Sequence, residues 1–219
     1  MPIRPSLRIV LPLALFLPAW SLAAVLVTAV EGDVRQNGQP LAAFTQLDAG
    51  ASVELPAGAA VRLADTDRAR QSRWEGPATL RVDEAGIRAT GRQLERTALP
   101  GAIRSALLRA PANLKAVAGL DDDLPSRLIS ARLTAARQQY QRWRTQFPAD
   151  DVAPELYLLD VQLAARDGLG IQATMAEMAR RQPRNAQLAR LSAHMVSLNL
   201  AMSPGDPGAQ LEIKPLVSP

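Results

Sequence analysis

The chain contains a single histidine, His194, and no cysteine. One imidazole without thiolates cannot supply the ligand sets that hold transition metals in proteins. Cysteine–histidine catalysis is excluded as well, and no nucleophile-elbow sequence offers a serine to complete a triad with His194. Leu191 and Leu198 lie within about one helical turn of this histidine, so we expect it to be half-buried beside an apolar face. We therefore predict neither a metal nor a cofactor.

Carboxylates are the other candidates for chemistry, because two that face each other can act as general acid and base. The acidic groups of this chain are Asp65 with Asp67, Asp83 with Glu84, Asp121 with Asp122 and Asp123, and Asp150 with Asp151. Each group falls in a predicted turn or at a predicted helix start, where aspartate accepts backbone hydrogen bonds. The triple aspartate lacks the alternating acids and the glycine of an EF-hand loop. We predict no catalytic residue, and a carboxylate-based hydrolase is the less favoured alternative.

Trp74 is the one aromatic residue whose place the pattern leaves open. It follows the polar run over residues 68–73 and precedes Gly76 and Pro77. A tryptophan at this position either covers the core of a small sheet, which the burial of aromatic side chains favours, or stands exposed as a contact. Trp74 and its neighbour Arg73 are therefore the candidates for contact with a partner.

Residues 1–23 have the order of a secretory signal peptide. Two basic residues, Arg4 and Arg8, precede an apolar run and a small-residue cleavage site after Ala23. No cysteine follows, so lipoprotein processing is excluded, and the pattern predicts an exported, periplasmic protein. The alternative is an uncleaved anchor in the inner membrane, because the apolar run over residues 9–30 is long enough to span a bilayer.

The remaining chain is long enough for one sizeable core or two small domains. The formal net charge of the whole chain is +4 at pH 7, and two of the positive charges, Arg4 and Arg8, leave with the signal. No basic stripe is interleaved with aromatic residues, which argues against a nucleic-acid partner.

Apolar and polar side chains alternate with a period of two residues through much of residues 24–96. Arg62, Arg81 and Arg88 each stand between two apolar residues. Successive strand residues point to opposite faces of a sheet, so these arginines predict an apolar inner face and a solvated outer face. The region therefore reads as a small all-β domain, either a sandwich or a barrel.

Turn residues separate these predicted strands at regular intervals. Asn37-Gly38 is the strongest signal, because both residues tolerate the positive φ of a two-residue hairpin. Four further turns are expected at Pro56-Ala57-Gly58, Asp65-Thr66-Asp67, Glu75-Gly76-Pro77 and Asp83-Glu84-Ala85-Gly86.

Residues 97–126 are predicted as a linker with a short helix over residues 102–108. Pro125 and the preceding acidic cluster then mark a helix start near Ser126. From there the period changes from 2 to 3.6, and the apolar residues of the first long helix are Ile129, Leu133, Ala136, Tyr140, Trp143 and Phe147. Pro148 ends this helix.

Three more helices are expected in the helical domain, which we place at residues 127–200. Asp150 or Asp151 caps the helix over residues 153–167, a third helix covers residues 170–182, and Asn185 caps the fourth. Residues 201–219 read as a flexible tail.

Pro148 and Pro183 stand 35 residues apart, each at the end of one predicted helix and the start of the next. Two helices joined near Gly168 lie between them. This segment resembles a tetratricopeptide repeat, whose unit of about 34 residues often closes with proline. Stacked helical hairpins of this kind present a groove for a partner peptide.

Four short segments in residues 24–91 together resemble the FecR-type domain of bacterial envelope proteins. They are Gly32-Asp33-Val34, Leu47-Asp48-Ala49-Gly50-Ala51-Ser52-Val53, Ala60-Val61-Arg62-Leu63 and Gly76-Pro77-Ala78. The resemblance implies a small β-domain in the periplasm. In the namesake iron-transport regulators this domain relays a signal from an outer-membrane receptor to a sigma factor. This chain departs from that arrangement, since no cytoplasmic segment precedes its hydrophobic run.

Together these patterns predict an α+β protein, with a FecR-like β-domain followed by an α-helical hairpin or repeat-like domain. We expect a non-enzymatic interaction module of the envelope, whose partner is an envelope protein or a peptidoglycan-type polymer. The alternative is a membrane-anchored, FecR-like signalling regulator.

Overall fold

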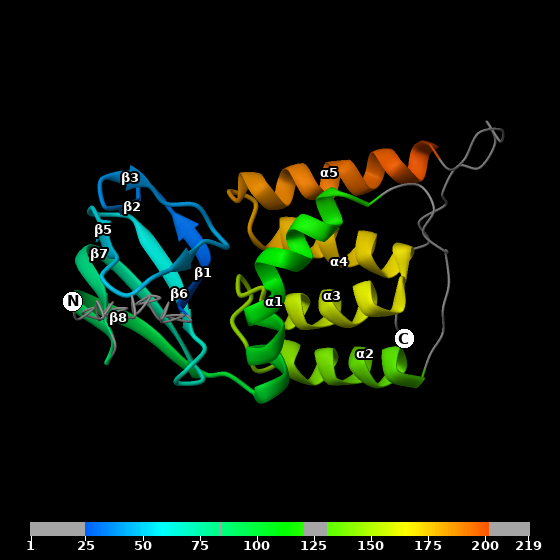
Figure 1. The fold of residues 1–219 in the computed structure, drawn as a ribbon, viewed down its shortest axis with the longest axis horizontal. Helices are drawn as coiled ribbons and strands as arrows, with labels where there is room; N and C mark the ends of the chain where they lie inside the picture. The colour runs from blue at the N-terminus through cyan, green and yellow to red at the C-terminus, as the bar shows by residue number, and fades with distance from the viewer. Residues whose placement is uncertain (1–24, 84, 121–130, 202–219) are drawn as a thin grey trace, which may run out of the picture.

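The computed structural model describes residues 25–83, 85–120 and 131–201. Within these residues a curled antiparallel sheet comes first along the chain and five helices follow it (Figure 1). This order confirms the predicted α+β class at the level of architecture.

Eight strands of the described chain form one antiparallel sheet. Its order is β3-β2-β5-β7-β6-β1-β4, and β8 pairs with β7 off this path. The strands are β1 (Val25–Glu31), β2 (Arg35–Gln36), β3 (Gln39–Pro40), β4 (Gln46–Leu47), β5 (Ser52–Leu55), β6 (Ala60–Asp65), β7 (Arg70–Asp83) and β8 (Gly86–Ala98).

The hairpin predicted at Asn37-Gly38 is confirmed. Asn37 has a φ of 49° and Gly38 a φ of 80°, and Gln36 pairs with Gln39 across the turn. Two successive positive φ values are the signature of the type I′ turn, whose twist matches that of the flanking strands.

Glu75-Gly76-Pro77, predicted as a turn between strands, instead lies inside the long strand β7. The first part of β7 pairs with β6 and the second part with β5, so the sheet curls around this point. A Cβ atom on Gly76 would stand 2.0 Å from the carbonyl oxygen of Pro56. Glycine therefore produces a bend here, because only a residue without a side chain allows the two backbones to approach so closely.

The inner face of the curled sheet holds an apolar core, which we call the β-core. It is made by alternate residues of most strands, as the period of two predicted. Its fully or nearly fully buried members include Val27, Val53, Val61, Leu63, Leu80 and Val82.

The prediction of a solvated outer face is right for Arg81 and Arg88, which are exposed, and wrong for Arg62. Every residue of β6 is buried, and Arg62 is 2% exposed. The helices cover the outer face at β6 and its neighbour β1, so both faces of these two strands are shielded from water (Figure 1).

The helices are α1 (Gly101–Ala118), α2 (Ala131–Arg144), α3 (Ala153–Ala165), α4 (Gly168–Arg181) and α5 (Ala186–Ala201). Helices α2 to α5 follow one another as a layer of neighbours, and α1 crosses this layer while packing on α3 and α5 (Figure 1). Asn185 caps α5 as predicted, since its Oδ1 accepts from the backbone nitrogens of Gln187 and Leu188.

Helix α1 is longer than the short helix predicted over residues 102–108. It continues through Pro111, which lacks the backbone N–H of a helix interior. Beyond the proline, Leu114 and Val117 are buried in the helical core, so packing outweighs the cost of the lost hydrogen bond. The predicted end of the next helix is also wrong, because α2 ends at Arg144 and not at Phe147.

The helical core is one apolar cluster that draws residues from every described helix. It includes Ile103, Leu107, Trp143, Leu156, Ile171, Met175 and Leu188. Leu26, Phe44 and Ala64 of the sheet region belong to the same cluster. The two parts of the chain therefore share apolar contacts as well as the polar ones described below.

Several predictions concern residues outside the described ranges: the signal peptide (residues 1–23), the helix start at residues 121–126, and the tail from residue 202 onward. Residues 25–30, part of the membrane-anchor alternative, belong to strand β1. Within the described ranges, no helix has the length and apolar character needed to cross a bilayer.

Candidate functional site

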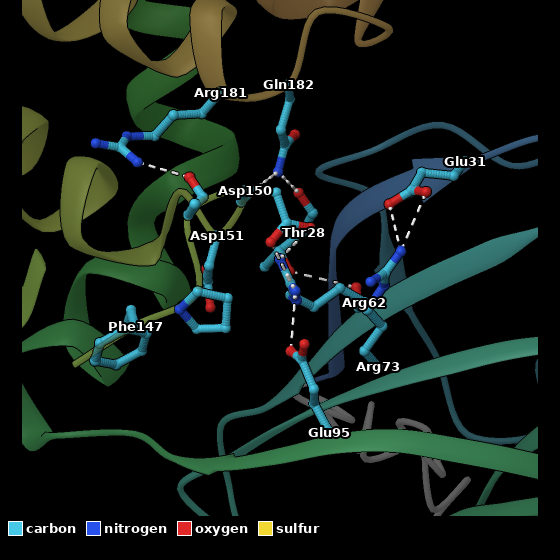
Figure 2. Close-up of polar contacts among 12 residues, drawn as sticks. Thr28, Glu31, Arg62, Arg73, Glu95, Phe147, Asp150, Asp151, Arg181 and Gln182 are labelled. Atoms are coloured by element: carbon cyan, nitrogen blue, oxygen red, sulfur yellow. Dashed lines mark hydrogen bonds and ion pairs between the residues drawn. The ribbon is translucent and has the colours of Figure 1, made fainter. Parts of the chain in front are cut away.

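A cluster of hydrogen-bonded polar side chains lies where the outer face of the sheet meets the loop between α2 and α3. We call it the joint, and it consists of Thr28, Arg62, Gln71, Glu95, Asp150, Asp151 and Gln182 (Figure 2). Strands β1, β6, β7 and β8 supply the first four residues. The α2–α3 loop and the end of α4 supply the other three.

Arg62 is the central cation of the joint. Its guanidinium lies 3.1 Å from a carboxylate oxygen of Glu95 and 3.2 Å from Asp150. Its side chain is 3% exposed, whereas the two acids keep about a third of their surface or more in contact with water. Burial alone would lower the pKa of Arg62, but the carboxylates of Asp151, Asp150 and Glu95 raise it above its ordinary value.

The adjacent aspartates of the α2–α3 loop respond to this cation in opposite ways. Burial pushes the pKa of Asp150 upward, but the charge and hydrogen bond of Arg62 outweigh it, so the pKa is lowered. Asp151 is 1% exposed, and its burial raises the pKa above the ordinary value despite Arg62. The predicted cap of α3 by Asp150 or Asp151 is wrong, because Val152 occupies the N-cap position. Asp151 still accepts from the backbone nitrogen of Ala153 at 2.9 Å, one residue into the helix.

Amide and hydroxyl groups complete the joint. Gln71 donates to the hydroxyl of Thr28 at 3.0 Å and to Asp151 at 3.4 Å. Gln182 donates to the backbone oxygens of Thr28 at 3.2 Å and Asp150 at 3.1 Å. Residues 154 positions apart are therefore tied by direct bonds.

A second ionic centre supports the loop from the helical side. Glu155 is fully buried and pairs with Arg144 and Arg181, each at 2.8 Å. Arg144 also donates to the backbone oxygens of Asp151 at 2.7 Å and Phe147 at 3.1 Å. The loop that contacts the sheet therefore bonds to Arg62 of β6 and to Arg144 of α2.

The chemistry of the joint is structural. Its one cation, Arg62, faces three carboxylates. Gln182 satisfies backbone oxygens, whereas Gln71 donates to side-chain oxygens. A hollow of about 380 Å³ opens beside it, lined in part by Glu31, Arg181 and Asn185. Glu31 pairs with Arg73, and Arg181 pairs with Glu155. Arg184 also lines this hollow, and it forms no ion pair with another described residue.

Among the other acidic groups considered from the sequence, Glu84 and residues 121–123 lie outside the described ranges, and the described acids Asp65 and Asp67 do not face one another as a catalytic pair would. Asp65 is buried and accepts from the backbone nitrogen of Arg68, whereas Asp67 is exposed. Asp83 pairs with Arg88. Within the described ranges, no group of three or more acidic or histidine side chains could hold a metal ion. His194 is half-buried, as expected from its place beside Leu191.

Trp74 and Arg73 lie on opposite faces of the sheet. Arg73 is in register with Arg62 on the outer face and pairs with Glu31 at 3.0 Å. Trp74 is in register with Val61 and packs against the β-core. Their contact with a partner stays a prediction, and the structure assigns the two residues to different surroundings.

Sequence reasoning missed Arg62 and Glu155 as buried ionic centres. A signal was present in both elements. Ala60 and Ala64 flank Arg62 on the outer face of β6, and small apolar residues there indicate a covered face. Helix α3 is apolar nearly all round, which indicates a central helix and therefore a buried Glu155.

A groove lies between α1 and α2, with α3 as its floor. We call it the α1–α2 groove; its volume is about 480 Å³. Its charged and aromatic residues are Arg109, Arg132, Arg142, Tyr157 and Asp160. Arg109 binds Asp160 through two bonds of 2.7 Å.

Comparison with known proteins yields no match among protein-family models, curated proteins or solved structures. The FecR-type and tetratricopeptide resemblances therefore remain predictions.

Proposed function

We propose that this chain is a non-enzymatic, exported interaction module of the bacterial envelope, which binds an acidic segment of a partner protein in the α1–α2 groove. The β-domain and the joint then serve as the support that holds this groove in a fixed place. The FecR-type resemblance and the signal-like residues 1–23 support the envelope location.

The charge of the α1–α2 groove is the observation that carries this proposal. Among the described residues, Asp160 is the only acidic side chain that lines it, and Arg109 already neutralises that carboxylate. Arg132 and Arg142 form no ion pair with another described residue. Two unmatched guanidinium groups in a groove favour carboxylate ligands, which they can bind through charge-assisted hydrogen bonds.

Tyr157 gives the groove an apolar and aromatic element. Its ring meets Trp143 edge-on, with centroids 4.8 Å apart, so the ring is held in place from behind. Burial raises the pKa of Tyr157 above its ordinary value, and the nearby Arg132 and Arg142 partly offset this rise. A neutral tyrosine between two arginines suits a peptide with both acidic and apolar side chains.

Arg132→Gln together with Arg142→Gln tests the proposal. The probe is a labelled short peptide of alternating aspartate and leucine, and its counterpart has asparagine in place of aspartate. We expect the double variant to bind the acidic probe about tenfold more weakly, because two charge-assisted contacts are lost. Fluorescence anisotropy at physiological salt measures the affinity.

The matched control is Arg184→Gln together with Arg190→Gln, two exposed arginines outside the groove. This variant removes the same charge and should bind the acidic probe like the unmodified chain. Equal loss in both double variants would mean that net charge alone attracts the peptide. Equal binding of the aspartate and asparagine probes would also reject the proposal.

A further inference from the structure

A second hollow, independent of the α1–α2 groove, lies beside Trp74 on the β7–β8 ribbon. We call it the Trp74 hollow; its volume is about 220 Å³. Its polar and aromatic lining comes mainly from Arg68, Arg70, Ser72, Trp74, Gln93 and Arg96.

Strand register explains why these residues meet. Arg70, Ser72 and Trp74 alternate along β7 and therefore share one face. Arg96 of β8 stands directly opposite Ser72, and Gln93 stands opposite Trp74. Opposite and diagonal neighbours on paired strands lie about 5–8 Å apart, so Arg70 and Arg96 can reach one small anion together.

The described lining of the hollow has an excess of positive charge. Its one acidic residue among the described ones, Asp65, is paired with Arg68 at 3.3 Å. Arg70 and Arg96 make no ion pair and no side-chain hydrogen bond to another described residue. The planar guanidinium group matches the geometry of a carboxylate, which it binds through two parallel hydrogen bonds.

Trp74 supplies a ring that is already oriented. Its indole nitrogen donates to the hydroxyl of Ser72 at 3.0 Å, and its body packs against the β-core. Ile87 also lines the hollow and packs against the same core. An aromatic surface with two nearby arginines favours a ligand that has both an apolar ring face and a negative charge.

We infer that the Trp74 hollow binds a single carboxylate-bearing sugar ring. The volume is below the roughly 300–1,000 Å³ of most small-molecule sites, which suits one ring and not a longer oligomer. A compact inorganic anion would use Arg70 and Arg96 but leave Trp74 without a role. The inference goes beyond the acidic-peptide proposal and does not depend on it, because the two sites share no residue.

The test uses the chain from Ala24 onward, which keeps every residue of both apolar cores, and N-acetylmuramic acid as the probe. N-acetylglucosamine is the control sugar, since it has the related ring without the carboxylate. We expect saturable binding of the acid by calorimetry, with the neutral sugar and inorganic phosphate each about tenfold weaker or more. Arg70→Gln with Arg96→Gln should weaken the acid about tenfold.

Arg81→Gln with Arg92→Gln is the matched control, because both residues are exposed on the same ribbon outside the hollow. This variant should bind the acid normally.

Trp74→Phe should weaken binding of the sugar acid while leaving binding of phosphate unchanged. Absence of saturable binding, equal affinity for acid and neutral sugar, equal affinity for phosphate, or full binding by the Arg70 and Arg96 variant would each overturn the inference. Circular dichroism checks that each variant is folded. If the double variant does not fold, Arg96→Gln alone replaces it in the test, because Arg96 lies on β8, which pairs only with β7.

Discussion

Arg62 shows how far a residue's role depends on what covers it. The side chain stands in a strand with ordinary alternation, yet it is almost fully buried between Glu95 and Asp150. A buried guanidinium loses its hydration, and it is tolerated only when carboxylates and backbone groups replace the lost water. The same reasoning applies to Glu155, which is fully buried between Arg144 and Arg181.

Replacing Arg62 with methionine should destabilise the protein by about 3–5 kcal/mol at pH 7, because Asp150 and buried Asp151 then lack their cation. Urea unfolding measures the change. Arg81→Met is the control; Arg81 is exposed on β7, and its loss should change the free energy of unfolding by no more than about 0.5 kcal/mol.

The loss of stability caused by Arg62→Met should depend on pH in a predictable direction. Without the cation, burial raises the folded-state pKa of both carboxylates above the ordinary value of 3.8. An acid with a raised folded pKa favours the native state below its unfolded pKa, and this contribution is lost as the pH rises. The defect of Arg62→Met should therefore be smaller near pH 4 than near pH 7, and an equal defect at both values would show that lost packing, not charge, is its cause.

At the level of elements, β7 organises the sheet. It pairs with β6 along its first part, with β5 along its second, and with β8 along most of its length. The bend at Gly76 lets one strand serve both halves of the curled sheet. The long β7–β8 ribbon in turn supplies the Trp74 hollow and, through Glu95, one of the carboxylates of the joint.

Gly76→Ala should cost about 3 kcal/mol or more, since the new methyl group would meet the backbone of Pro56 and force one strand to move. Gly101→Ala is the control, because a Cβ there meets no atom within 4 Å and Gly101 lies at the start of α1. Thermal unfolding followed by circular dichroism separates the two. A Gly76 variant as stable as the Gly101 variant would show that the bend can open without loss.

For the whole molecule, the sheet and the helices form one structural unit. Leu26 and Ala64 extend the helical core onto the outer face of the sheet, and the joint adds ionic and amide contacts beside them. The β-core covers the inner side of β1 and β6, and the apolar area on their outer side is hidden only when the helices are present. The interface therefore contributes to the stability of each part.

We expect the chain from Ala24 onward to unfold in one transition, with tryptophan fluorescence and far-ultraviolet circular dichroism changing together. Trp74 reports on the sheet and Trp143 on the helices, so the two parts can be followed by Trp74→Phe and Trp143→Phe variants. If the sheet unfolds at a different temperature from the helices, the conclusion that the two parts form one structural unit is contradicted.

Local sequence signals determined much of this architecture. Asn37-Gly38 predicted its hairpin because few residues tolerate positive φ, and the Asn185 cap followed from the need of a helix start for an acceptor. Leu133, Ala136 and Trp143 were correctly predicted as the buried face of α2, since a helix repeats its surface every 3.6 residues. These features depend on residues within a few positions of one another, so the local sequence is enough to predict them.

Only the tertiary structure decided which surfaces are covered. Alternation defines the two faces of β6, but it does not state that helices from residue 101 onward lie against the outer one, where Arg62 meets Asp150. The full length of α1 beyond Pro111 depends in the same way on the core it packs into. The gathering of Arg70, Trp74 and Arg96 depends on the register of β7 with β8. In each case the deciding free energy comes from contacts between residues far apart in the chain, and local pattern carries no record of those contacts.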